Sequence, residues 1–342
     1  MWNNQGRIPK IILTGIFAAA ICFSAAWINF PVSQVRNVPS QYVSACLNRI
    51  NIPAEDLHWV YVPEYADQLY TEENYFFLAG QLIKNKIVDA SSCPSGGLAQ
   101  NGYANACGMS AAKPTGIIIQ NMLNEPILQA WKDTGVPPVM LKQLIRIESQ
   151  FWPSEFDYIH FGFGHITDIG MRNVLDWNRS IYAKFCTASA GGNCATKEGA
   201  AYQILDSLVS ICPTCENGID PASASRSVDI LAQVLLGYCY QTEQLVYNAT
   251  GWNPILAVDY VTIWKLTLMN YNAGPGCVYD AVVDAFKTTN GPIRWPDIVA
   301  HTKEDRCLRG LYYAKNITSK YFNFPSSRQE NVNLDLPSNS GD

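Results

Sequence analysis

The stretch that decides the fold, PPVMLKQLIRIESQFWP, runs from Pro137 to Pro153. A proline pair at its start predicts the first turn of a helix, where the missing N–H costs no hydrogen bond. The helix then places Leu141, Leu144 and Ile145 on one face. Glu148 follows on the same face at the i+7 position. A carboxylate therefore lies in line with the apolar stripe that we expect to face the core.

The position of Glu148 allows two interpretations. An unpaired carboxylate in an apolar setting favours its protonated form, which is the form that a general acid needs. Alternatively, Glu148 ends the helix and turns to solvent, or it pairs with Arg146 or a distant lysine. Structural ion pairs also place acids beside apolar faces, so the helix alone leaves both interpretations open.

Composition predicts a globular protein that does not bind polyanions such as nucleic acid. The chain has 342 residues, of which 48% are hydrophobic and 15% are charged, enough for one main domain with additions or for two domains. The net charge of -5 provides no basic surface and argues against nucleic acid as a partner. The 18 tyrosines and 9 tryptophans suit a carbohydrate-binding groove, although they could equally fill the core.

The first 30 residues have the pattern of an export segment. Arg7 and Lys10 precede an apolar run at 11–23, and small residues follow at 24–26. This pattern predicts a signal peptide or an N-terminal membrane anchor, with a tether through residues 11–30. Extending the run to Phe30 makes it long enough for a span, so the pattern leaves cleavage open.

The cysteines support the same location. The chain has 11 cysteines. Cys22 lies within the export segment, and the other ten, an even number, all follow that segment. We therefore expect disulfides and an extracytoplasmic location: periplasm, cell wall or outer face of the membrane. The Cys212-Pro-Thr-Cys215 pair favours a structural bridge over a redox motif or half a zinc site, because no second such pair or nearby histidine accompanies it. The scattered histidines predict no metal, and no nucleotide or cofactor motif is found.

Apolar periodicity predicts an all-α or mostly α fold, because no segment has a convincing strand pattern. Thr71 is the expected N-cap of one helix, and the stripe Ile118, Met122, Leu123 and Ile127 is the expected inward face of another. The segment 91–113 reads as a loop closed by a disulfide between Cys93 and Cys107. Besides the helix that begins at Pro137, helices are expected at 41–50, 71–88, 115–132, 196–209, 228–247, 254–269, 277–287 and 306–321.

After the export segment at 1–30, the chain divides into an N-terminal region, a main domain with an insertion, and a tail. Residues 31–124 form an N-terminal helical region of unassigned role, and residues 125–322 form the main domain. Within it, the cysteine-bearing residues 176–226 are expected to be an insertion. The polar tail 323–342 is expected to be disordered.

Four motifs resemble those of the lytic transglycosylases of the lysozyme-like superfamily. ESQFWP at 148–153 resembles their E-S-x-F-x-P motif, and GFGHIT at 162–167 resembles their G-L-M-Q or G-L-G-Q motif with its following Ile or Val and Thr. YNAGPG at 271–276 matches Y-N-A-G-x-G, and YAKNI at 313–317 resembles the closing Y-V-x-x-I helix. The motifs occur in the family's order between residues 125 and 321. The resemblance implies a lysozyme-like helical domain.

The resemblance also implies an activity and a substrate. Lytic transglycosylases cleave the β-1,4 bond between N-acetylmuramic acid and N-acetylglucosamine in peptidoglycan glycan strands, without water as the acceptor and without a cofactor. Glu148 would protonate the glycosidic oxygen and then accept the proton of the muramoyl 6-hydroxyl, which closes a 1,6-anhydro ring. The family lacks the second catalytic carboxylate of most glycosidases. Glu155, Asp157 and Asp168 are the nearby acids in this chain.

The remaining site residues carry over one at a time. Tyr271 and Asn272 would hold the substrate acetamide and the Glu148 carboxyl, and Tyr313 would donate to that carboxyl or only pack. Gly162 and Gly164 would let a sugar lie against the backbone, with Phe163 beside it. Ser149 would bind substrate or cap its helix. Two departures from the family pattern are His165 in place of a glutamine and Arg309 in place of a glutamate.

Two other functions fit the same residues. A goose-type lysozyme would use the same fold to transfer the sugar to water. A noncatalytic wall-binding or assembly module would keep the groove without turnover, although such a binder has no need for a destabilising acid at Glu148.

Overall fold

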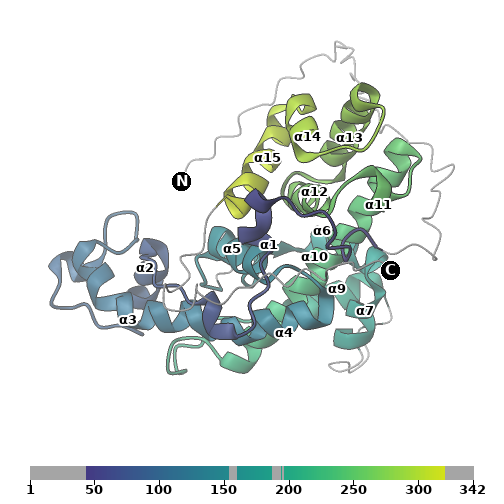
Figure 1. Ribbon diagram of the computed structural model, residues 1–342. Helices are drawn as coiled ribbons and strands as arrows, with labels where there is room; N and C mark the ends of the chain where they lie inside the picture. The colour runs from purple at the N-terminus through teal and green to yellow at the C-terminus, as the bar shows by residue number, and fades with distance from the viewer. Residues whose placement is uncertain (1–43, 154–159, 187–193, 195, 320–342) are drawn as a thin grey trace, which may run out of the picture. The chain divides into compact units, whose positions relative to one another are not determined.

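The computed structural model describes residues 44–153, 160–186, 194 and 196–319. Helices dominate these residues, which confirms the all-α prediction (Figure 1). The one sheet in the described part of the chain is a short antiparallel hairpin, in which β1 (His160–Phe161) pairs with β2 (Ile166–Thr167). This hairpin was not expected, because two residues per strand are too few to leave an alternating pattern in the sequence.

The N-terminal region contains short helices before its two long ones. Their bounds are η1 (Ala54–Asp56), α1 (Leu57–Val60), η2 (Ala66–Leu69), α2 (Phe76–Lys84), η3 (Pro94–Gly97), α3 (Ala106–Met122) and α4 (Asn124–Thr134). Leu78, Ala79 and Leu82, within the helix expected at 71–88, are buried in α2. Figure 1 shows α2 and α3 side by side, in agreement with their contacts.

Two of the expected helices in this region are wrong in extent. Residues 44–50, the described part of the expected helix at 41–50, form a turn, because the backbone of Cys46 bonds to distant side chains instead of to its neighbours. Residues 71–75 are also not helical, and Thr71 is not an N-cap. The backbone N–H and C=O of Thr71 bond to the side chain of Asn121 on α3, at 2.9 and 2.6 Å.

The expected helix at 115–132 is two helices. α3 begins earlier, at Ala106, where Asn105 accepts a hydrogen bond from the N–H of Gly108 at 2.9 Å. The expected loop at 91–113 is therefore shorter than predicted. Ile118 is 50% exposed, and Ile119 is the buried residue instead. α2 and η3 pack on α3 and cover its buried face.

The expected central helices are present. α5 (Pro138–Ser149) begins at the predicted proline pair, and Leu141, Leu144 and Ile145 are fully buried. α10 (Pro221–Thr250) is longer than the expected helix at 228–247 and buries most of its residues. It contacts α4, α6, α12 and α13, so it is the element around which the described part of the protein packs.

The C-terminal helices close over α10. Their bounds are α11 (Pro254–Ala257), α12 (Tyr260–Ala273), α13 (Pro275–Thr289), α14 (Trp295–His301) and α15 (Asp305–Thr318). The expected helix at 254–269 is divided, because Asp259 caps a new helix by accepting from the N–H of Thr262 at 2.7 Å. α15 lies tightly against α12, where a Cβ at Gly310 would be 2.8 Å from Cβ of Ala273.

The segment after β2 carries α6 (Asp168–Trp177), α7 (Arg179–Ile181), a π-helical turn (Tyr182–Cys186) and α9 (Lys197–Asp206). Thr196 caps α9 by accepting from the N–H of Gly199, which agrees with the helix start expected from the sequence. α9 packs on α6.

Four disulfides join described cysteines: Cys46–Cys239, Cys93–Cys107, Cys212–Cys215 and Cys277–Cys307. The predicted closure of the segment after α2 and the structural bridge at 212–215 are both confirmed. Disulfides in this number are compatible with an extracytoplasmic location.

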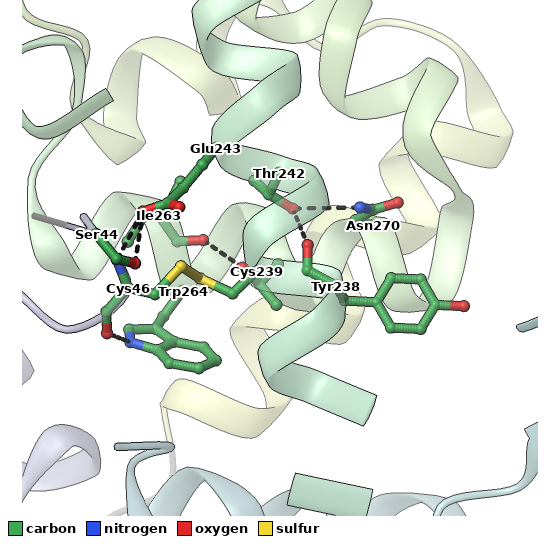
Figure 2. Close-up of a disulfide and its surroundings, with 10 residues drawn as sticks. Ser44, Cys46, Tyr238, Cys239, Thr242, Glu243, Ile263, Trp264 and Asn270 are labelled. Atoms are coloured by element: carbon green, nitrogen blue, oxygen red, sulfur yellow. Dashed lines mark hydrogen bonds between the residues drawn. A yellow bond between two sulfur atoms is a disulfide. The ribbon is translucent and has the colours of Figure 1, made fainter. Parts of the chain in front are cut away.

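The bond between Cys46 and Cys239 ties the start of the described chain to α10 (Figure 2). Oε1 of Glu243 accepts hydrogen bonds from Oγ of Ser44 at 2.8 Å and from the N–H of Cys46 at 3.2 Å. Nε1 of Trp264 donates to the carbonyl oxygen of Cys46 at 3.1 Å. Burial raises the pKa of the Glu243 carboxyl, and these hydrogen bonds act in the opposite direction. The N-terminal segment is thus fixed to the core by one covalent and three polar contacts.

Within the described ranges, the helices include none with both the length and the apolar character that a membrane span needs. The predicted export segment at 1–30 and the predicted disordered tail at 323–342 lie outside the described residues.

Candidate active site

Glu148 lies in the last turn of α5 with both carboxylate oxygens contacted. The hydroxyl of Tyr313, on α15, donates to Oε1. Nδ1 of His165 lies 3.4 Å from Oε2, and the two side chains are each 16% exposed. The alternative partner Arg146 instead donates from Nε to Oε1 of Gln143 at 2.5 Å. The side chain of Glu148 therefore points to α15 and the hairpin and not to bulk solvent.

Three tyrosines form a continuous wall behind this carboxylate. The ring of Tyr271, on α12, stacks on Tyr313 with centroids 6.4 Å apart and planes at 17°. Tyr238, on α10, meets Tyr271 edge to face at 5.2 Å. The hydroxyl of Tyr271 donates to the carbonyl oxygen of Gly164 at 2.5 Å, which fixes the hairpin turn against α12.

The environment keeps these phenols neutral. Burial raises the pKa of Tyr271 and of Tyr313 well above their ordinary value, and the charge of Glu148 raises both further. Burial also raises the pKa of Tyr238 to about 12. Each phenol consequently retains its proton at any physiological pH, and Tyr313 is a permanent hydrogen-bond donor to Glu148.

The hairpin turn holds His165 beside Glu148 in an uncommon backbone conformation. His165 has φ of 51°, in the left-handed region that few residues with a side chain adopt. Gly164 packs closely on α10, since a Cβ there would lie 2.4 Å from Cδ1 of Leu231 and would displace that side chain. Strain of this kind persists where the surrounding packing enforces it, and it is common in functional sites.

A cavity of about 490 Å³ opens in front of the carboxylate. Of the predicted site residues, Glu148, His165, Tyr271 and Asn272 line it, and so does Ser149. Asn272 is exposed at the end of α12. The structure thus brings together side chains from α5, the hairpin and α12, with Tyr313 of α15 behind them. The complete lining is Phe77, Tyr103, Ile147, Glu148, Ser149, Gln150, His160, His165, Thr167, Tyr271 and Asn272.

Other predicted residues do not line this cavity, or have their polar group engaged elsewhere. Phe163 is only 1% exposed, and Gly162 and Gly164 are buried against Leu208 and Leu231. The Ser149 hydroxyl donates to the carbonyl oxygen of Ile145 at 3.0 Å, within its own helix. These residues support the site from behind or from within α5.

Several lining residues were not predicted. Gln150 and Thr167 lie within the recognised motifs, and His160 lies two residues before one of them, so the motifs were the available signal. Phe77 and Tyr103 belong to the region 31–124, where no motif marked them. Their part in the cavity follows from the packing of α2 beside the end of α5, which sequence patterns do not reveal.

Of the three acids that the sequence places near Glu148, the structure describes only Asp168. Glu155 and Asp157 lie outside the described residues. Asp168 pairs with Arg172 at 2.5 Å and does not line the cavity. Among the described residues, Glu148 supplies the one carboxylate of the lining. No cluster of three or more His, Cys, Asp or Glu side chains suited to a metal ion was found in the described ranges.

Comparisons with known proteins add no relative. No family model, no curated protein and no solved structure matches the chain. The site has to be interpreted from its own chemistry.

Proposed function

We propose that this protein is a lytic transglycosylase that cleaves the β-1,4 bond between N-acetylmuramic acid and N-acetylglucosamine in peptidoglycan, with Glu148 as its single acid and base. The observation that carries the proposal is the Glu148 carboxyl, held between Tyr313 and His165 at the wall of a cavity of about 490 Å³. The four motifs that resemble this family supply the residues of that arrangement.

In the first step, protonated Glu148 gives its proton to the glycosidic oxygen as the bond between that oxygen and C1 breaks. The N-acetylglucosamine side leaves as an alcohol. In the second step, the Glu148 carboxylate accepts the proton of the muramoyl 6-hydroxyl, and the 6-oxygen bonds to C1. Glu148 returns to its acid form, no water is consumed, and the substrate acetamide supports the cationic centre in between.

The neighbours of Glu148 suit these two steps. Tyr313 stabilises the carboxylate that exists between the steps, because hydrogen bonds to a charged acceptor are stronger than those to a neutral one. Tyr271 holds the hairpin through Gly164 and thereby positions His165. The exposed amide of Asn272 offers both a donor and an acceptor to a substrate acetamide.

Hydrolysis of the same bond is the second candidate, and His165 favours it. Its imidazole lies 3.4 Å from Glu148 and lines the cavity, so it is a second proton acceptor within reach of a water molecule. The hydrolase and the transglycosylase differ in product, since hydrolysis adds one water to the muramic acid end.

The test is digestion of purified peptidoglycan sacculi followed by mass spectrometry of the soluble fragments. We expect 1,6-anhydro products from the native protein and none from Glu148→Gln. Glu125→Gln, in the first turn of α4 and exposed, is the matched control and should keep full activity. Products heavier by one water identify the hydrolase. Equal product from Glu148→Gln contradicts a catalytic Glu148. No product from the native protein contradicts the enzyme and leaves the wall-binding module.

A further inference from the structure

Two aromatic side chains of the N-terminal region stand in the wall of the cavity beside the candidate active site. Phe77, on α2, and Tyr103, from the loop before α3, both line the cavity that contains Glu148. Their rings meet edge to face with centroids 5.7 Å apart. Phe77 is half-buried, whereas Tyr103 is 42% exposed. The two rings therefore offer aromatic surface to a ligand in the cavity.

The position of Tyr103 is set by close contact between its loop and α2. The N–H of Ala104 donates to the carbonyl oxygen of Phe76 at 2.9 Å. A Cβ at Gly80 would lie 2.5 Å from the carbonyl oxygen of Gly102 and 3.0 Å from Cα of Tyr103, so only glycine allows the loop to rest there. The disulfide Cys93–Cys107 closes the surrounding segment. The loop is therefore a fixed platform for the ring.

The helix α2, which carries Phe77, is bonded directly to the end of the helix that carries Glu148. The N–H of Phe77 donates to Oε1 of Gln150 at 3.2 Å. Gln150 ends α5 in the left-handed conformation, with φ of 47°, and itself lines the cavity. One residue further, Phe151 packs on Tyr75 with centroids 5.5 Å apart. The aromatic pair and the carboxylate thus keep a fixed relation to each other.

We propose that Phe77 and Tyr103 form a sugar-binding subsite that takes a residue of the glycan strand next to the bond held at Glu148. This inference rests on the proposed function and extends it to the substrate: the protein would bind a strand that continues past the cleaved linkage. An aromatic ring packs well on the apolar face of a pyranose, where ring C–H groups point to the π face.

The charge of the cavity favours sugar over the peptide part of the cell wall. Its lining includes one carboxylate and neither lysine nor arginine. Peptide stems carry carboxylates, which find neither lysine nor arginine to pair with in this lining. Neutral amides and hydroxyls of N-acetylated sugars, by contrast, match Gln150, Thr167 and Asn272, which share the cavity with the two rings.

The experiment measures binding of oligomers of N-acetylglucosamine by calorimetry in the Glu148→Gln background, which separates binding from turnover. Tyr103→Ala should weaken binding of the hexasaccharide roughly three- to tenfold, the range for losing one aromatic contact. The disaccharide should bind equally in both proteins. Tyr103→Phe keeps the ring and should bind as the parent does. Tyr202→Ala, at an exposed tyrosine of α9, is the control for loss of a surface ring.

Phe77→Leu is the second variant, because it keeps bulk on α2 and removes the ring; it should also weaken hexasaccharide binding. Unchanged hexasaccharide affinity in both Tyr103→Ala and Phe77→Leu overturns the subsite. Digestion of sacculi distinguishes this failure from that of the proposed function. Anhydro products with an unaltered KM in Tyr103→Ala leave the activity intact and remove the subsite. Ring-dependent binding without any product removes the activity and leaves the subsite.

Discussion

Replacing Lys142 by methionine should flatten the pH dependence of stability above neutral pH. Lys142 lies on α5 and is only 1% exposed. Its ammonium group donates to the carbonyl oxygen of Leu69, to Oδ1 of Asn124 at 2.6 Å and to Oδ1 of Asn121 at 3.3 Å. One buried lysine thereby joins the N-terminal region to the helix that carries Glu148.

The magnitude follows from the difference between the folded and unfolded pKa. Burial lowers the pKa of Lys142 from 10.5 to about 7, and the charge of Glu73 acts in the opposite direction. Between these two values the unfolded chain keeps a proton that the folded protein has released, so the free energy of unfolding rises with pH. The slope is about 1.4 kcal/mol per pH unit, or about 2 kcal/mol between pH 7.5 and 9. For a chain of this length such a change corresponds to a rise in Tm of roughly 3 °C.

The assay is thermal unfolding at pH 7.5 and pH 9 under oxidising conditions, for the native protein and for Lys142→Met. The variant should have a lower Tm at both values, because buried acceptors lose their donor, and the rise between them should disappear. Lys287→Met, at a lysine 70% exposed on α13, is the control and should retain the rise. If native protein and Lys142→Met show the same change in Tm with pH, Lys142 remains charged in the fold and the reasoning is refuted.

Two further predictions concern α15. Tyr313→Phe should lower kcat on sacculi roughly 10- to 100-fold with little change in KM. The variant removes a hydrogen bond of about 1.5 to 3 kcal/mol to the Glu148 carboxylate. A kcat within twofold of the native value would show that Tyr313 only packs. Gly310→Ala should lower the free energy of unfolding in urea by about 1 to 3 kcal/mol, because its Cβ would lie 2.8 Å from Cβ of Ala273. The control is Gly276→Ala, whose Cβ would have its nearest neighbour at 3.8 Å. It should leave the free energy of unfolding unchanged within about 0.5 kcal/mol.

Local signals predicted the elements that carry the site. The proline pair before α5 and the apolar stripe of Leu141 and Ile145 defined that helix, because proline geometry and burial act within one element. The turn between α12 and α13 was also predicted, since Gly274 and the following proline end one helix and begin the next. Glu148, Tyr271 and Asn272 were identified by motif, and they do line one cavity.

Contacts between distant segments account for what was missed. The helices expected at residues 44–50 and 71–75 do not form, because distant side chains bond to the backbone there. Asn121, about 50 residues away, accepts from the N–H of Thr71, and Glu243, about 200 residues away, accepts from the N–H of Cys46. Phe77 and Tyr103 were missed for the same reason. Nothing near Phe77 in sequence indicates Gln150, yet the N–H of Phe77 bonds to it across 73 positions of the chain.

The disulfide between Cys46 and Cys239 also constrains how the protein is made. The two cysteines are separated by 193 positions in the chain. Oxidation of this pair therefore has to wait until α10 has been synthesised. Any disulfide that Cys46 forms earlier with a cysteine between the two has to be reshuffled before the native bond can close.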